Sequence, residues 1–129
     1  MINTEILLTV LVNKFNRILP TYREDAPEAE SDECYCVLTH FKHTDVPADQ
    51  PSDLVFFYAD FYGDDRLPND STKLIGFCDQ ARSELDGEII GAADVFGGHL
   101  NFEQTIPEQE TDFDINHRRQ EWTARVFWR

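Results

Sequence analysis

The C-terminal residues 122–129 constrain the fold of this chain more than any other segment, because large apolar side chains alternate there with mostly polar ones. One face of the segment would carry Trp122, Ala124, Val126 and Trp128, and the other Thr123, Arg125, Phe127 and Arg129. Such alternation is typical of a half-buried β-strand. We therefore expect the C-terminus to be part of the core, although chain ends are usually frayed.

A short strand is expected just before this run, at Phe113–Ile115. The polar stretch between the two, residues 116–121, predicts an exposed loop, so that residues 112–129 would form a hairpin. This loop is cationic in an otherwise acidic chain. A projecting hairpin of this kind suits a partner surface better than a catalytic cleft.

The rest of the chain predicts two helices and three strands. Apolar residues at helical spacing favour a helix over 4–19, ended by Pro20, and a second over 71–85, capped by Asp70 or Ser71. Strands are expected at 34–42, 54–62 and 99–106, whereas the glycine-rich residues 88–98 are expected to be irregular. The fold class is then α+β in a single domain, 1–129. Its small mixed or antiparallel four-stranded sheet would have two packed helices, in the order α-β-β-α-β-β.

The net charge of −14 and the pI near 4.4 exclude a general electrostatic attraction to nucleic acid or to anionic membranes. An aromatic content of 12% argues against disorder. A strongly acidic small domain can instead mimic DNA, inhibit a basic nuclease, or belong to a conduit through which DNA slides without adhering.

Metal and cofactor sites are not expected. Cys34, Cys36 and His40 would share one strand face but spread over roughly 20 Å, so one zinc ion cannot reach all three. The spacing of a calcium loop and the glycine motifs that bind phosphate are also missing. Acidic loop residues are instead expected to be solvated; among these are Asp60, Asp64 and Asp65.

Catalysis is not expected either, so the protein is predicted not to be an enzyme. The sequence has no Gly-x-Ser-x-Gly elbow. Cys78 and His99 could be drawn as a nucleophile and base, but Cys78 falls on the apolar face of the second helix. The three cysteines form no disulfide framework and indicate a reducing compartment, and no signal peptide or membrane span is visible.

Arginine and tryptophan near the C-terminus indicate a subunit contact, because both residue types are enriched at protein interfaces. The acidic loops of one subunit could meet this cationic hairpin on its neighbour. The candidate interface comprises Arg118, Arg119, Trp122 and Arg125 with Asp64 and Asp65.

The order of these elements resembles that of the tail terminator proteins of long-tailed phages, such as that of phage lambda. That family consists of small acidic α+β proteins with an N-terminal helix, two strands separated by a long loop, a second helix and a C-terminal hairpin. The corresponding segments here are 4–19, 34–62, 71–85 and 112–129. The resemblance covers nearly the whole chain and is one of architecture.

The resemblance implies a structural virion protein at the head-proximal end of the tail, made in the host cytoplasm. It would cap the tail tube as a homo-hexameric ring, bind the tube protein and the head connector, and let DNA pass without binding it. The alternative is an acidic inhibitor, such as an immunity protein or an anti-restriction or anti-CRISPR mimic of DNA. Symmetry separates the two, since a terminator must close a ring.

Overall fold

The computed structural model describes residues 3–23, 34–43, 52–63, 70–106 and 116–129, and every structural statement below concerns these residues. They form two helices and six strands in the order α-β-β-β-α-β-β-β. The elements are α1 (Thr4–Asn16), β1 (Thr21–Arg23), β2 (Tyr35–His43), β3 (Ser52–Gly63), α2 (Asp70–Leu85), β4 (Ile89–Ala92), β5 (Phe96–Ile106) and β6 (Asn116–Trp128).

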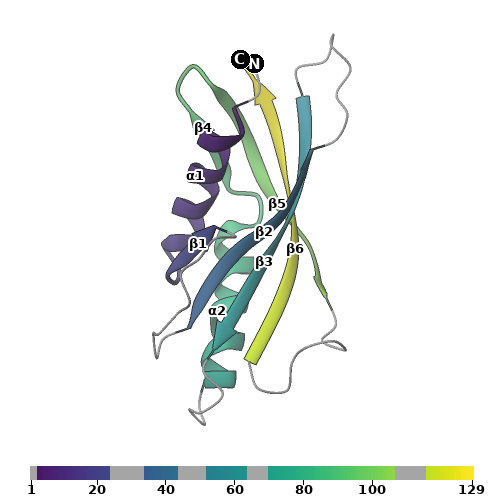
Figure 1. Cartoon of the computed structure of the whole chain (residues 1–129). Helices are drawn as coiled ribbons and strands as arrows, with labels where there is room; N and C mark the ends of the chain where they lie inside the picture. The colour runs from purple at the N-terminus through teal and green to yellow at the C-terminus, as the bar shows by residue number, and fades with distance from the viewer. Residues whose placement is uncertain (1–2, 24–33, 44–51, 64–69, 107–115) are drawn as a thin grey trace.

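All six strands belong to one mixed sheet, in the order β1-β2-β3-β6-β5-β4. Only β1 and β2 run parallel, and the other neighbours are antiparallel. The sheet is strongly curled, and both helices lie on the same side of it (Figure 1). One face is therefore covered by helices. We call the opposite face, which no described helix covers, the uncovered face.

The expected four-stranded sheet is wrong, and two short strands account for most of the difference. β1 has three residues and is held by its parallel pairing with β2, so no alternation of its own could indicate it. β4 lies in the segment expected to be irregular. The glycines there serve a close approach, because a Cβ on Gly98 would collide with the carbonyl oxygen of Arg125.

The C-terminal strand is also longer than expected. β6 begins at Asn116 and pairs with β3 along nearly its whole length, so the expectation of an exposed loop at 116–121 is wrong. The strand expected at Phe113–Ile115 lies outside the described residues. The alternation expected for residues 122–129 is confirmed, because Trp122, Ala124 and Val126 are buried while Arg125 and Phe127 are exposed.

α1 forms where the sequence places an apolar stripe. Leu7, Leu11 and Phe15 are fully buried at a spacing of four residues, and the side chain of Asn3 caps the backbone N–H of Ile6 at 3.3 Å. The helix ends at Asn16 rather than at residue 19, because the Asn16 side chain accepts a hydrogen bond of 3.0 Å from the backbone of Thr21 and turns the chain into β1.

The core lies between the two helices and the covered face. Phe15 of α1 packs edge-on against Trp122 of β6 and Phe57 of β3, with ring centroids 5.3 and 6.1 Å apart. Gln120 of β6 donates to the carbonyl oxygen of Cys78 in α2 at 3.0 Å, which joins the second helix to the same face. The uncovered face is therefore where functional side chains can reach a partner.

Candidate functional site

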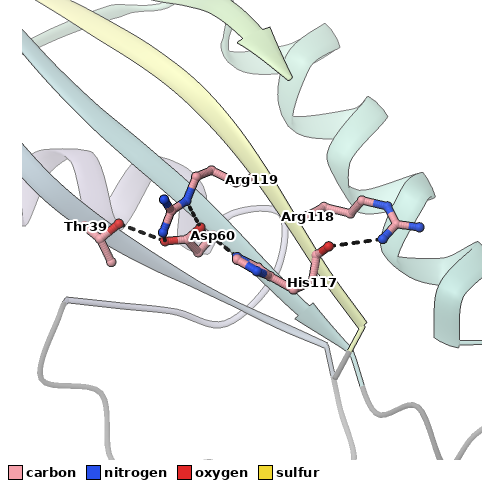
Figure 2. A network of polar contacts seen from close by, with 5 residues as sticks. All are labelled: Thr39, Asp60, His117, Arg118 and Arg119. Atoms are coloured by element: carbon pink, nitrogen blue, oxygen red, sulfur yellow. Dashed lines mark hydrogen bonds and ion pairs between the residues drawn. The ribbon is translucent and has the colours of Figure 1, made fainter. Parts of the chain in front are cut away.

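A buried carboxylate, Asp60 of β3, lies on the uncovered face with only 1% of its surface exposed. Arg119 of β6 binds it with two nitrogens, Nε at 2.7 Å and a terminal nitrogen at 3.2 Å. His117 Nε2 lies 2.8 Å from the same carboxylate, and the Thr39 hydroxyl of β2 donates to it at 2.8 Å (Figure 2). Four residues from three adjacent strands thus share one network.

The protonation of this network is set by its contacts. Burial would raise the pKa of the Asp60 carboxyl, but the hydrogen bonds from His117, Arg119 and Thr39 outweigh burial and lower that pKa below its ordinary value. The hydrogen bond to Asp60 in turn raises the pKa of Arg119. Asp60 is therefore an ionised, fully engaged anion, which suits an anchor between strands better than a catalytic base.

Four rings form a ladder beside the carboxylate, one from each of four neighbouring strands. Tyr22 lies 6.2 Å from Tyr35 in an edge-on contact, Tyr35 stacks on Tyr62 at 5.1 Å, and Tyr62 stacks on His117 at 4.6 Å with an interplanar angle of 3°. Burial and the nearby Asp60 charge raise the pKa of Tyr62 to about 12, so its hydroxyl stays neutral. The ladder gives this end of the uncovered face an aromatic surface.

The structure separates the six residues of the candidate interface. Arg119 is engaged by Asp60, and its guanidinium also lies 4.6 Å from the centre of the Tyr58 ring. Trp122 is fully buried against α1, so its side chain contributes to the core rather than to the surface. Arg118 is half-buried and donates to the carbonyl oxygen of His117 at 3.1 Å.

Arg125 alone among the described members of the candidate interface is exposed. It lies on the uncovered face, in register with Leu54 of β3 and His99 of β5. Asp64 and Asp65 lie outside the described residues. The subunit contact itself stays a prediction, with its cationic side now centred on Arg125 rather than on an exposed loop.

Asp60 was expected from the sequence to be a solvated loop acid, and its network was not predicted. The residue lies within the run Leu54–Tyr62, which is otherwise almost entirely apolar. A carboxylate inside a strand of this kind is buried, and buried carboxylates are almost always paired. That rule could have identified Asp60 as a paired group, but its partners on β6 come from a segment expected to be a loop.

A second buried carboxylate, Asp53, was also missed. His43 Nδ1 lies 2.6 Å from it, the indole nitrogen of Trp128 donates to it at 3.4 Å, and the Thr4 hydroxyl lies 3.3 Å from His43 Nε2. The order hydroxyl, imidazole, carboxylate is that of a catalytic triad. Because these groups join the start of α1 to the ends of three strands, we interpret the cluster as a clamp on the fold.

The cysteines belong to the core layer. Cys34 and Cys36 are buried and Cys78 is half-buried. Burial raises the pKa of the Cys36 thiol, and it raises that of Cys78 to about 12, so neither is a reactive thiolate. Within the described residues, no three His, Cys, Asp or Glu side chains are grouped as metal ligands.

A bulge in β2 opens a hollow on the uncovered face. Between Thr39 and Lys42 the register with β3 shifts, and His40 adopts a left-handed backbone conformation with φ of 56°. The hollow has a volume of about 200 Å³ and is lined by His40, Lys42, Phe56, Phe57, Tyr58 and Glu121. It combines an aromatic floor with charges of both signs, which suits a side chain of a partner protein.

The charge of the chain is unevenly distributed along its sequence. The segments 24–33, 44–51, 64–69 and 107–115 contain 14 of the 25 acidic residues and one of the 11 basic residues. The remaining residues hold 11 acids and 10 bases, a net charge of −1. The framework of helices and strands is therefore nearly neutral, and the acidity of this chain belongs to the segments that connect its elements.

Three of these segments, 24–33, 64–69 and 107–115, adjoin the same end of the sheet, where β2 begins, β3 ends and β6 begins. They contain 12 of those 14 acidic residues. The exposed Arg125 lies toward the opposite end of β6. The two ends of the sheet thus differ strongly in the charge attached to them.

No protein-family model matches the chain, and no curated protein matches it significantly. Among the described residues, no helix is long and apolar enough to cross a membrane.

Proposed function

We propose that this protein is a structural virion protein that caps a phage tail tube as a hexameric ring and joins it to the head connector. The observation that carries the proposal is a nearly neutral framework with one uncovered face, aromatic along β3, and acidic segments attached mainly at one end. A subunit with unlike ends and an uncovered face can assemble head to tail, and such contacts close into a ring when the rotation per subunit is right.

The observed order, α-β-β-β-α-β-β-β, differs from the one expected for a tail terminator by the short strands β1 and β4, and the proposal rests on the elements that the two orders share. The chain has an N-terminal helix, the strand pair β2 and β3 separated by residues 44–51, a second helix, and a final strand, β6, that pairs with β5. A ring of subunits that each carry a net charge of −14 would repel DNA rather than bind it. The proposed partners are a second copy, the tube protein and the head connector.

Arg125 is the residue through which we propose to test the subunit contact. A reversal of Arg118 and Arg119 would be ambiguous, because Arg119 holds the buried Asp60 and its loss would destabilise the monomer. Arg125 is exposed, so reversing its charge should leave the fold intact. Arg125→Glu should therefore weaken ring closure without changing the melting temperature.

The decisive experiment is electron microscopy of virions of the phage that carries this gene, with mass spectrometry of the tails. We expect six copies at the head-proximal end of the tube. Absence of the protein from purified virions would overturn the proposal.

A second candidate is the acidic inhibitor. The 14 acidic residues concentrated in four connecting segments favour it, since such segments could occupy a basic nuclease cleft as DNA does. The inhibitor needs no ring. Tight one-to-one binding to a nuclease or CRISPR complex, together with absence from virions, would support this function instead.

A further inference from the structure

The hollow beside the bulge in β2 has charged side chains of opposite sign on its two sides. Lys42 of β2 lies in register with Phe56 of β3, and Glu121 of β6 lies in register with Tyr58 of the same strand. Because β3 separates β2 from β6, the two aromatic residues lie between the two charged ones. A ligand in the hollow therefore meets a cation at one end, aromatic rings along its length and an anion at the other end.

The separation of the two charged residues sets the length of a suitable ligand. Lys42 and Glu121 are two strands apart and offset by two residues along the sheet, which places their backbones about 12 Å apart. The hollow has a volume of about 200 Å³, whereas sites for drug-sized ligands have about 300–1,000 Å³. It thus suits a small linear ligand whose own charges lie at its two ends.

Both charged side chains are available to such a ligand. Lys42 is exposed and has no ion-pair partner among the described residues. Glu121 is half-buried, and its Oε2 accepts a hydrogen bond of 2.7 Å from Gln104, which orients the carboxylate without neutralising it. Arg119 also lies against the Tyr58 ring, but its guanidinium is bound to Asp60. Neither Lys42 nor Glu121 is therefore neutralised by an ion pair within the described part of the chain.

The strained backbone of the bulge supports a functional role for the hollow. His40 has a φ of 56°, a left-handed conformation that costs free energy for any residue with a side chain. Its ring lies edge-on to Tyr58 at 5.5 Å and lines the hollow. Glycine would adopt this conformation without strain. Since bulges often re-aim a side chain beside a functional site, the histidine at this position indicates that its ring serves the hollow.

The charge of the whole chain favours one class of ligand. A net charge of −14 repels an anion from the surface, and the ammonium group of Lys42 opposes a simple cation in the hollow. A ligand with one charge of each sign has no net charge, so the field of the chain does not oppose its approach. Such a ligand can also satisfy Lys42 and Glu121 together.

We propose that the hollow binds a linear zwitterion. Its carboxylate pairs with Lys42, its ammonium group pairs with Glu121, and its aliphatic chain lies over Phe56 and Tyr58. This chemistry is found in a free ω-amino acid such as ε-aminocaproate. It is also found in a C-terminal lysine, whose α-carboxylate and ε-ammonium are separated by the same number of carbon atoms. The inference goes beyond the proposed ring and does not depend on it.

Binding is tested by titrating ε-aminocaproate into the isotope-labelled full chain and recording NMR spectra. We expect saturable shifts at residues of β2 and β3 around the hollow at millimolar concentrations. Caproate and n-hexylamine have the same length but one charge each, and each should bind about fivefold more weakly because it lacks one ion pair. Absence of saturable shifts, or equal affinity for either singly charged compound, would overturn the proposal.

Two charge-neutral variants assign the ends of the ligand. Lys42→Gln and Glu121→Gln should each weaken binding of ε-aminocaproate by about fivefold. Lys73→Gln and Glu84→Gln are the matched controls, because both residues are exposed on α2, on the covered side of the sheet, and both variants should bind like the parent. The melting temperature of each variant checks that the fold is intact. An affinity that depends on neither Lys42 nor Glu121 would overturn the proposed site.

A short peptide that ends in lysine distinguishes the two sources of the ligand. If the peptide binds as tightly as ε-aminocaproate and its C-terminal amide does not, the occupant is the end of a partner chain. If only ε-aminocaproate binds, the occupant is a free ω-amino acid. Equal binding of the peptide and its amide would overturn recognition of the carboxylate. Because these measurements use the isolated protein, their failure leaves the proposed virion function standing, and absence of the protein from virions leaves the binding result unchanged.

Discussion

The side chains on the two faces of the sheet differ in burial and in type. On β3 the covered face presents Val55, Phe57, Ala59 and Phe61, all essentially without exposure. The uncovered face of the same strand presents Leu54, Phe56, Tyr58 and Tyr62, all partly exposed, around the buried Asp60. Antiparallel sheets commonly have one solvated polar face. Here β3 contributes mainly aromatic side chains to that face, whereas the neighbouring β6 contributes polar and charged ones such as Arg119, Glu121 and Arg125.

This difference indicates what each face does. The covered face is packed against the helices, and its residues account for most of the stability of the monomer. The uncovered face keeps the side chains of Leu54, Phe56, Tyr58 and Tyr62 partly exposed, and its central carboxylate is paired with Arg119 and hydrogen-bonded to His117. Apolar surface that does not serve the fold marks an interaction site. Substitutions on the covered face should therefore affect stability more than assembly. Substitutions of exposed residues on the uncovered face should affect assembly more than stability.

The largest effect is expected on the covered face, from Trp122→Ala. This side chain is fully buried and contacts Phe15 and Phe102, so the variant loses about 3–5 kcal/mol of unfolding free energy. Urea denaturation measures the loss. Phe127→Ala is the control on the other face of the same strand: 45% of Phe127 is exposed, and the cost should stay below about 1 kcal/mol. Equal costs would contradict the division between faces.

The second largest effect on stability is expected from Asp60, the buried carboxylate of the uncovered face. Asp60→Asn keeps the size of the side chain but leaves Arg119 and His117 without their anion, which should cost about 2 kcal/mol near neutral pH. Asp79→Asn, at an exposed position on α2, is the control and should change the unfolding free energy by less than about 0.5 kcal/mol. A neutral result for Asp60→Asn would show that the network does not stabilise the sheet.

The ionisation of Asp60 also predicts that the stability of the fold depends on pH. The folded pKa of Asp60 is lowered from its ordinary value of 3.8, so its stabilisation is fully present above about pH 4 and is lost as the pH falls through the folded pKa. Melting curves from near-neutral to strongly acidic pH should show this loss in the parent. Asp60→Asn should lose less stability over the same range, and parallel curves would contradict the assignment.

The covered face was largely predictable from sequence, because it follows simple periodicity. The helical spacing in α1 and the alternation in residues 122–129 both indicated buried residues that the structure confirms. The failures occur where pairing overrides local preference. β1 exists only through β2, and Gly98 lies in a strand because only glycine allows the approach to Arg125.

The uncovered face was much less predictable, for a physical reason. Residues 116–121 are polar, so they were expected to be exposed, yet their polar groups are satisfied inside the fold. On the uncovered face Arg119 and His117 bind Asp60, and on the covered face Gln120 binds the backbone of α2. These hydrogen bonds join residues that are far apart in the chain, so no local pattern in a single sequence predicts them.

A smaller effect is expected from the aromatic ladder. Tyr62→Leu removes the ring between Tyr35 and His117 and should lower the unfolding free energy by about 1 kcal/mol. Tyr62→Phe keeps both stacked contacts and is the matched control, expected to unfold like the parent. A cost shared equally by both variants would assign the effect to the hydroxyl group instead of the stacking.

The smallest effect on stability, and the sharpest contrast between the faces, is expected from Arg125→Glu. The side chain is exposed on the uncovered face, so the unfolding free energy should change by no more than about 0.5 kcal/mol. Assembly should change much more, because the reversal places a carboxylate where we propose that the acidic segments of a neighbour approach. Arg125→Lys keeps the charge and should assemble like the parent, whereas rings in both variants would remove Arg125 from the interface. If Arg125→Glu instead destabilised the monomer as much as Asp60→Asn, Arg125 would serve the fold, as Asp60 does, and the proposed role of Arg125 in the subunit contact would fail.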